Sequence, residues 1–286
     1  MAFAGASARV FSIMQTTTVD IGGSAQLLGP TGQRVYLNTT SNSPSDIPAW
    51  PPSVTATSPA AVSIRPALYE LTQGTMDSQL HAFLMGAPAA PAAPSLVGMW
   101  HEASTQGPGA AYAGYFNTLD ANFPEQHGAH GLLTQAQAYV WRKAHDWGAN
   151  VKVGAIEVNQ ATDNTSAWNN LNQWMAPDLD FYATDTYDGK DGTSVPADLM
   201  NAFQYVANTL GPNAAVGVTE TNSRFPGRRP YWFTGMWSWL VSNGYTSDST
   251  CYLTFWNPTG KESGDWIADD WATIDAFYAI FQQSSP

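Results

Sequence analysis

Residues 96–102 read LVGMWHE, a short apolar run that ends in a histidine and a carboxylate. Other short runs of apolar and β-branched residues recur along the chain, bounded by turn residues and mostly followed by a helical pattern. Such alternation is typical of a parallel sheet whose strands are joined by helices. The predicted strands are Ala8–Met14, Arg34–Asn38, Ala61–Arg65, Leu96–His101, Val151–Val158, Leu179–Thr184, Ala214–Thr219 and Cys251–Trp256.

Amphipathic helices are predicted between several of these strands. Apolar side chains share one face over residues 199–210, which a Gly-Pro pair follows, and again over residues 232–240. A last helix is predicted over residues 265–281, with its N-cap near Asp265. The alternation of strands and helices therefore continues to the end of the sequence.

Eight strands alternating with helices in 286 residues close most economically into a (β/α)8 TIM barrel, because closure removes both sheet edges. We predict an α/β fold in which residues 1–286 form a single catalytic barrel domain. The alternative is an open, doubly wound sheet. No glycine-rich G-x-G-x-x-G turn follows the first predicted strand, so the nucleotide site typical of that alternative is not indicated.

The charge balance is strongly acidic and excludes two classes of partner. The chain has 11 Lys and Arg against 23 Asp and Glu, which gives a net charge of −12. Nucleic acids and anionic membranes both attract basic surfaces, so neither is expected to bind. Charged residues make up only 12% of the chain and hydrophobic residues 44%, which favours a large core over disorder.

The use of cysteine and aromatic residues narrows the function further. The single cysteine, Cys251, excludes an internal disulfide and any site built from several cysteines. No stretch reaches the roughly 18 apolar residues that a membrane span needs. Twelve Trp, twelve Tyr and twelve Phe make the chain rich in rings. Besides filling a core, such rings suit the binding of uncharged sugars, whose apolar faces stack on indole.

Two of the six glutamates end apolar strands. Glu102 follows the fourth predicted strand and Glu220 follows the seventh. In barrels of this kind the reacting groups come from the C-terminal ends of strands, and strands four and seven face each other across the mouth. Two facing carboxylates are the groups that glycoside hydrolysis uses, one to donate a proton and one to attack or stabilise the anomeric carbon. The alternative is that both glutamates form salt bridges at the rim.

The same residues resemble a known group of enzymes. Glutamates at the ends of strands four and seven are similar to those of the clan of retaining (β/α)8 glycoside hydrolases that contains β-mannanases, cellulases and xylanases. Most of its families have Asn before the first glutamate, whereas Trp100-His101-Glu102 looks like the WHE signature of glycoside hydrolase family 26. Residues 63–84 also resemble that family's segment from the third strand to a G-x-x-D helix start. The similarity extends over residues 61–256.

The resemblance implies a role for each matching residue. Glu102 would be the acid/base and Glu220 the nucleophile, so that hydrolysis retains the anomeric configuration. His101 would support the acid or the adjacent sugar. Tyr187 matches the tyrosine that hydrogen-bonds the nucleophile in this clan, and Trp256 matches the tryptophan beneath the cleaved sugar.

Four further residues are expected to line the substrate site. Arg65, at the end of the third predicted strand, would bond the nucleophile or a sugar hydroxyl. Trp100 would form an apolar wall beside Glu102. Family mannanases carry a tryptophan soon after the strand-four glutamate, where this chain offers Tyr112 and Tyr115. The expected substrate is therefore a neutral β-mannan, β-glucan or xylan, cleaved by an endo-acting enzyme.

Several alternatives remain open. Glu157 ends the fifth predicted strand and could replace either glutamate. Asp185, Asp188 and Asp191 are close in sequence but lack the spacing of a calcium loop. A barrel that only binds glycans would have the same aromatic cleft, and it would release no reducing ends from polysaccharides.

A metal-dependent barrel enzyme is a third class. It needs a cluster of His, Asp and Glu at several strand ends, and only His101 and Asp185 are available to join the two glutamates. We expect no metal and no cofactor. The partner is expected to be an oligo- or polysaccharide, and the protein a secreted monomer whose signal peptide is not among these residues.

Overall fold

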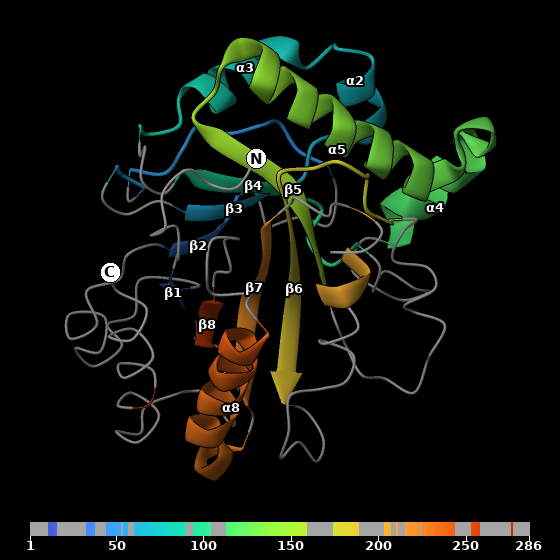
Figure 1. The fold of residues 1–286 in the computed structure, drawn as a ribbon. Coiled ribbons are helices and arrows are strands. Elements are labelled where there is room, and N and C mark those ends of the chain that lie inside the picture. The colour runs from blue at the N-terminus through green and yellow to red at the C-terminus, as the bar shows by residue number, and fades with distance from the viewer. Residues whose placement is uncertain are drawn as a thin grey trace.

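Eight parallel strands form one curved sheet at the centre of the protein (Figure 1). They are β1 (Phe11–Gln15), β2 (Gln33–Tyr36), β3 (Ala60–Ile64), β4 (Ser95–Met99), β5 (Val151–Val158), β6 (Phe181–Asp188), β7 (Ala215–Ser223) and β8 (Leu253–Asn257). The structure is a computed structural model that describes residues 11–15, 33–37, 44–52, 54–56, 60–89, 94–103, 113–158, 174–188, 203–206, 210, 215–223, 225–243, 253–257 and 276.

The strand order identifies the architecture. The order is β1-β8-β7-β6-β5-β4-β3-β2, and the two end strands β1 and β2 lie next to each other. Each strand therefore neighbours its successor in sequence all the way round. A doubly wound sheet would instead reverse its order at a switch point. The prediction of a (β/α)8 barrel is confirmed, and the open-sheet alternative is wrong.

Small and apolar side chains fill the inside of the barrel. The inner cluster consists of Ala61, Leu96, Ile156, Phe181, Ala183 and Ala215. Gly154 makes this packing possible, because a Cβ at that position would collide with the carbonyl oxygen and ring of Phe181. At Gly98 a Cβ would lie 2.8 Å from Cδ1 of Ile156. The glycines in β4 and β5 thus let neighbouring strands bring large side chains into a narrow interior.

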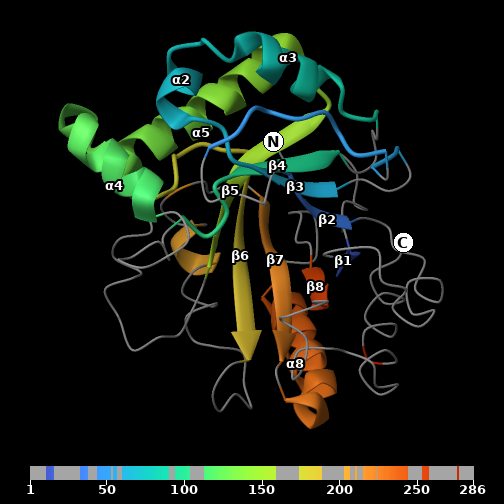
Figure 2. The same cartoon turned by 180° about the vertical axis from the view of Figure 1, so that it is seen from behind.

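The labelled helices cover the outside of the sheet in two groups (Figures 1 and 2). One group contains α2 (Leu68–Thr72), α3 (Asp77–Met85), α4 (Ala113–Asn122) and α5 (Gly128–Trp147), with a 3₁₀ turn η2 (Pro124–Gln126) before α5. The other is α8 (Arg229–Ser242), which follows the 3₁₀ turn η4 (Pro226–Arg228) and packs on β7.

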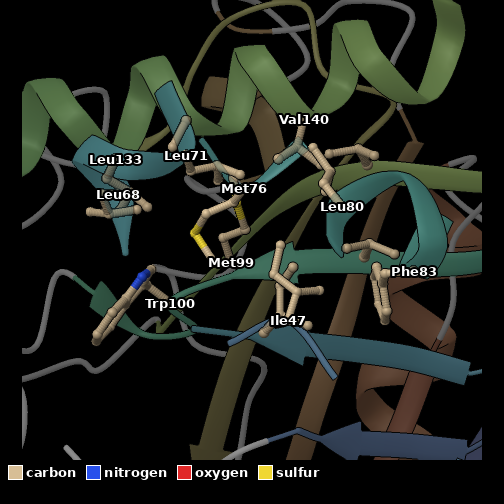
Figure 3. Close-up of a cluster of buried hydrophobic side chains, with 14 of the residues drawn as sticks. Ile47, Leu68, Leu71, Met76, Leu80, Phe83, Met99, Trp100, Leu133 and Val140 are labelled. Carbon is tan, nitrogen blue, oxygen red and sulfur yellow. The ribbon is translucent and has the colours of Figure 1, made fainter. Parts of the chain in front are cut away.

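The longest helix, α5, shows how the sequence sets these elements. Its buried residues Leu132, Leu133, Ala136, Val140 and Ala144 recur every three or four positions, which gives one apolar face. It ends at Gly148, whose φ of 66° is the left-handed conformation that glycine adopts easily. The apolar face packs with α2, α3, β3 and β4 in the cluster of Figure 3.

Two strands are longer than the sequence pattern predicts. We expected strand six to end at Thr184 and strand seven at Thr219, but β6 continues to Asp188 and β7 to Ser223. The added residues are mostly polar, so the apolar run ends before the strand does. Tyr187 and Glu220 consequently lie within strands rather than beyond them.

The predicted helices have mixed outcomes. The helix over residues 232–240 is confirmed within α8. The predicted G-x-x-D helix start is confirmed by α3, which begins at Asp77. The predicted helix over residues 265–281 and most of that over 199–210 lie outside the described residues. Among the helices that are described, none combines the length and the hydropathy that crossing a membrane requires.

Candidate functional site

The WHE sequence forms a tight turn at the carboxyl end of β4. Trp100 and Glu102 have φ angles of 48° and 56°, a left-handed conformation that costs a non-glycine residue about 1–2 kcal/mol. Two hydrogen bonds hold the turn: the backbone N–H of Trp100 donates to the carbonyl of Ile64 at 3.0 Å, and that of Glu102 donates to the carbonyl of Ile156 at 3.0 Å. Backbone strain of this kind concentrates at functional sites.

The buried side chain of Trp100 fixes this turn to the protein core. Its ring has no exposed surface, and its indole N–H donates to the carbonyl of Pro66 at 2.9 Å. Tyr115 stacks on the indole at 4.9 Å between ring centroids, and its hydroxyl accepts the backbone N–H of Leu68 at 2.7 Å. Because Trp100 is fully buried, the prediction that it lines the substrate site is wrong, whereas Tyr115 is half-buried and its place in the site stays a prediction. The Trp100 ring belongs to the buried cluster of Figure 3, and Tyr115 packs against that cluster.

Three polar side chains meet at the mouth of the barrel. Nε2 of His101 lies 2.6 Å from Oδ2 of Asp185 and 3.8 Å from Oε1 of Glu102. Asp185 comes from β6, and its side chain has no exposed surface, whereas that of Glu102 is 25% exposed. A substrate can therefore reach Glu102 but not Asp185.

Asp185 is held by a second contact. Its Oδ1 accepts a hydrogen bond from the Thr219 hydroxyl of β7 at 2.6 Å. Leaving a buried carboxylate without partners would cost several kcal/mol, so the hydroxyl and the imidazole stabilise it. The sequence indicated Asp185 only as a possible ligand in the metal-dependent alternative, not as a partner of His101 in the glycosidase site. The signal was available, because Asp185 continues the inward alternation of Phe181 and Ala183 along β6.

An irregularity in the sheet sets the register of Glu220. Along β6 and β7, Thr184 pairs with Val218, but the next pair is Asp185 with Glu220, so Thr219 is an extra residue. Without this bulge, Asp185 would pair with Thr219, and Glu220 would pair with Thr186. Bulges next to active sites change which positions share a face in this way. The side chain of Glu220 is outside what the structure describes.

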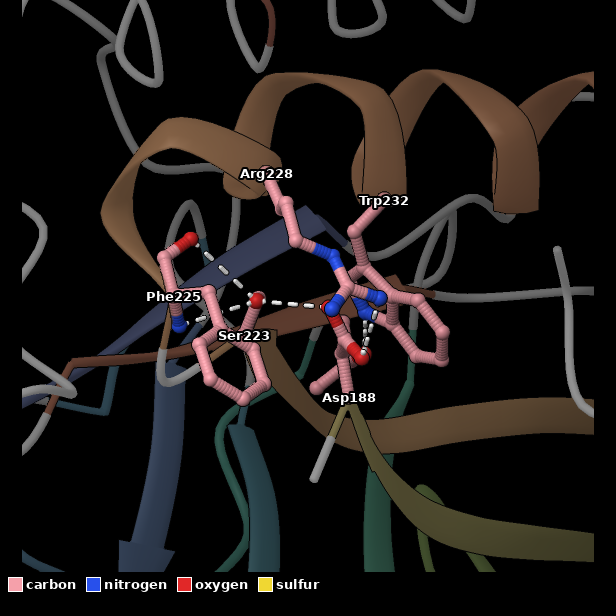
Figure 4. Close-up of polar contacts among 6 residues, drawn as sticks. Asp188, Ser223, Phe225, Arg228 and Trp232 are labelled. Carbon is pink, nitrogen blue, oxygen red and sulfur yellow. Dashed lines mark hydrogen bonds and ion pairs between the residues drawn. The ribbon is translucent and has the colours of Figure 1, made fainter. Parts of the chain in front are cut away.

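The outer face of the same two strands has its own polar cluster (Figure 4). The Ser223 hydroxyl donates to Oδ2 of Asp188 at 2.8 Å, and the guanidinium of Arg228 donates to Oδ1 at 3.2 Å. The indole N–H of Trp232 donates to the Thr221 hydroxyl at 2.9 Å. Asp188 thus joins the ends of β6 and β7 to η4 and does not face the mouth.

Two other predicted site residues come from neighbouring strands. Tyr187 is half-buried on β6, two residues beyond Asp185 and hence on the same face of the strand. Arg65 follows β3 directly and is buried, which lowers the pKa of its guanidinium by desolvation. It shares the inward alternation of Ala61, two pairs of residues earlier. Tyr112 and the side chain of Trp256 lie outside what the structure describes.

Glu157 lies on the other face of its strand. It is buried and alternates with Val153 and Ala155, which pack against the helices, whereas Ile156 points into the barrel. This position differs from that of Glu102.

One group of side chains could coordinate a cation. Within the part of the chain that the structure describes, His101, Glu102 and Asp185 offer three ligand atoms that all lie within 4.8 Å of one another. His101 already uses Nε2 in its contact with Asp185.

Comparisons with known proteins identify the fold. No family model and no curated protein sequence matches the chain. A family 26 β-mannanase from Bacteroides ovatus superposes with a TM-score of 0.55 and 13% identity, over 97% of this chain and 89% of its own. A glucosidase from Croceicoccus marinus gives 0.54 and 15%, over 98% and 69%. A modular endo-β-1,4-mannanase from Cellulomonas fimi gives 0.51 and 14%, over 96% and 70%. The chain has the barrel fold of these proteins, as the WHE resemblance implies.

Proposed function

We propose that this protein is a retaining glycoside hydrolase that cleaves β-glycosidic bonds in a neutral polysaccharide. One observation carries the proposal: the accessible carboxyl group of Glu102 lies beside His101 and buried Asp185, and the bulge in β7 pairs Glu220 with that same Asp185. The barrel fold shared with mannanases and a glucosidase supports it.

In the first step, Glu102 donates a proton to the oxygen of the leaving sugar. The Glu220 carboxylate attacks the anomeric carbon, the glycosidic bond breaks, and a covalent glycosyl-enzyme forms. In the second step, Glu102 takes a proton from water, whose oxygen attacks the anomeric carbon and releases Glu220. This route requires the two carboxyl groups to lie about 5–5.5 Å apart.

His101 and Asp185 would support Glu102 through charge. Asp185 is buried and has no access to the sugar, so its role is to hold the imidazole. Nε2 of the imidazole lies 2.6 Å from the buried carboxylate and 3.8 Å from Oε1 of Glu102, so its orientation sets the electrostatic environment of the acid. Arg65 and Tyr187, on the inward alternation of β3 and β6, would donate hydrogen bonds to Glu220 or to sugar hydroxyls.

Separate Glu102→Gln and Glu220→Gln variants test the mechanism. Glu220→Gln is expected to abolish turnover of every substrate, because no covalent intermediate forms. Glu102→Gln should spare glycosylation by aryl glycosides with acidic leaving groups, which need little protonation, and azide should accelerate release of the sugar. Exposed Glu125 provides the matched control, and Glu125→Gln should leave turnover unchanged. Equal losses for all substrates in both variants would contradict these roles.

The substrate class is tested on a panel of mannan, xylan, mixed-linkage glucan and cellulose. An endo-acting enzyme is expected to cleave at least one of these polymers within the chain, which releases new reducing ends and shortens the polymer rapidly. Binding without any release would instead indicate a barrel that only binds glycans. Such polymers do not enter cells, so we further propose that the protein acts outside the cell.

A further inference from the structure

We infer that Tyr36 is a positioning residue for the proton-donating step. Its ring would hold the His101 imidazole against Asp185 and so act on Glu102 through His101. This inference rests on the proposed function, because it concerns the role of Glu102 as the acid.

Tyr36 reaches the mouth from the far side of the site. It is the last residue of β2 and pairs with Ser63 of β3. Ser63 alternates with Ala61, which belongs to the cluster inside the barrel, so Tyr36 is on the inward face at the carboxyl end of its strand. Residues at that end of a barrel strand surround the reaction site.

The ring of Tyr36 contacts the imidazole directly. The centroids of Tyr36 and His101 are 5.0 Å apart, and the rings are tilted by 55°. This distance and tilt fall in the range of favourable aromatic pairs. The hydroxyl oxygen of Tyr36 is buried although the residue as a whole is half-buried, so the accessible part of the side chain is ring carbon.

His101 is thereby confined on several sides. Asp185 lies at Nε2, Glu102 is the next residue in the turn, and Tyr36 covers the ring. The second torsion of a histidine side chain is broad, so the ring needs neighbours to fix its orientation. Removing the Tyr36 ring would let the imidazole rotate away from Asp185.

The consequence is specific to one chemical step. If the imidazole leaves Asp185, an uncompensated negative charge remains next to Glu102. Glu102 then donates its proton less effectively. Proton donation to a poor leaving group would suffer. Attack on a substrate whose leaving group needs no proton would proceed normally.

The experiment compares Tyr36→Ala and Tyr36→Phe with the wild-type protein on two aryl β-glycosides, one with a dinitrophenyl and one with an unactivated phenyl leaving group. Tyr36→Ala should lower kcat/KM for the poor leaving group by about 10- to 100-fold, a part of what general acid catalysis contributes, and for the activated one by less than about threefold. Tyr36→Phe keeps the ring and should restore both rates. Tyr139→Phe, on the outer helix α5, is the matched control and should change neither.

A double variant distinguishes positioning from general damage. In the His101→Ala background, Tyr36→Ala should have no further effect on the poor substrate, because the residue acts through the imidazole. Equal losses for both substrates, or additive losses with His101→Ala, would overturn the inference. If Tyr36→Ala does not fold, Tyr36→Leu preserves most of the volume and makes the same comparison. Full activity of Glu102→Gln on the poor substrate would refute the proposed function itself. If Glu102→Gln is impaired but Tyr36→Ala keeps wild-type activity on that substrate, only this inference is refuted.

Discussion

Asp185 shows how much a single buried side chain contributes to this site. Its side chain contacts both the turn after β4, through His101, and the bulge in β7, through Thr219. None of its surface is accessible. At this scale, the chemistry of the exposed Glu102 depends on a carboxylate that a substrate never touches.

The isosteric substitution Asp185→Asn tests that dependence. It removes the negative charge beside His101 and should lower kcat/KM for poor leaving groups by about 10- to 100-fold. Asp180, which precedes β6, is the matched control, since it accepts the backbone N–H of Val153 at 2.9 Å and contacts His145 at 3.0 Å. Asp180→Asn should lower the melting temperature but leave kcat within about twofold, because the N-terminal ends of barrel strands serve stability. A reversed pattern would show that Asp185 is only structural.

At the scale of the elements, backbone geometry determines contacts between strands that the amino-acid composition does not reveal. The bulge in β7 decides that Glu220 and not Thr219 is the register partner of Asp185. Glycines in β4 and β5 allow the strands to come together around the inner cluster. Both features set the spacing of the strand ends from which the site is built.

Gly154→Ala tests the close approach of β5 and β6. The new Cβ would collide with Phe181, and overpacking of this kind costs about 1–3 kcal/mol. Gly235 in α8 is the matched control, because a Cβ there meets nothing within 4 Å. Gly235→Ala should stabilise the protein by about 0.5–1 kcal/mol through helix propensity. Urea unfolding measures both changes, and an undiminished stability of Gly154→Ala would contradict the close contact of Gly154 with Phe181.

At the scale of the whole molecule, the barrel sheet separates an inner from an outer core. The outer one buries tyrosines under the helices. Burial raises the pKa of Tyr115 to about 12, opposed by its bond from the Leu68 N–H and reinforced by the charge of Glu70. Burial likewise raises the pKa of Tyr182 to about 12.

These tyrosines predict a loss of stability in alkali. In the unfolded chain a tyrosine ionises near pH 10, whereas in the folded protein Tyr115 keeps its proton up to about pH 12. Stability is therefore fully present below pH 10 and falls as the pH rises towards 12. Tyr115→Phe should make the fall between pH 9 and 11 smaller by about 1 kcal/mol. Tyr231, 77% exposed, is the control, and Tyr231→Phe should leave the slope unchanged. Unfolding free energies between pH 9 and 11 measure the effect, and identical slopes for Tyr115→Phe and wild type would contradict it.

The amino-acid sequence by itself determined the repeating unit and the position of the exposed acid. Periodicity located all eight strands, because an apolar run between turn residues is a local signal. The WHE stretch located Glu102 at the end of the fourth strand. Strand ends were less predictable, since β6 and β7 continue through polar residues whose pairing depends on the neighbouring strand.

Only the tertiary structure decided which side chains share the mouth. It joined Tyr36, His101 and Asp185, which lie on three different strands or the turns that follow them. It also buried Trp100, because the left-handed backbone of this residue turns the chain at the end of β4 and its indole packs into the outer cluster. Contacts between distant residues depend on the curvature of the sheet and the register of its strands, and neither is encoded in any one segment of the chain.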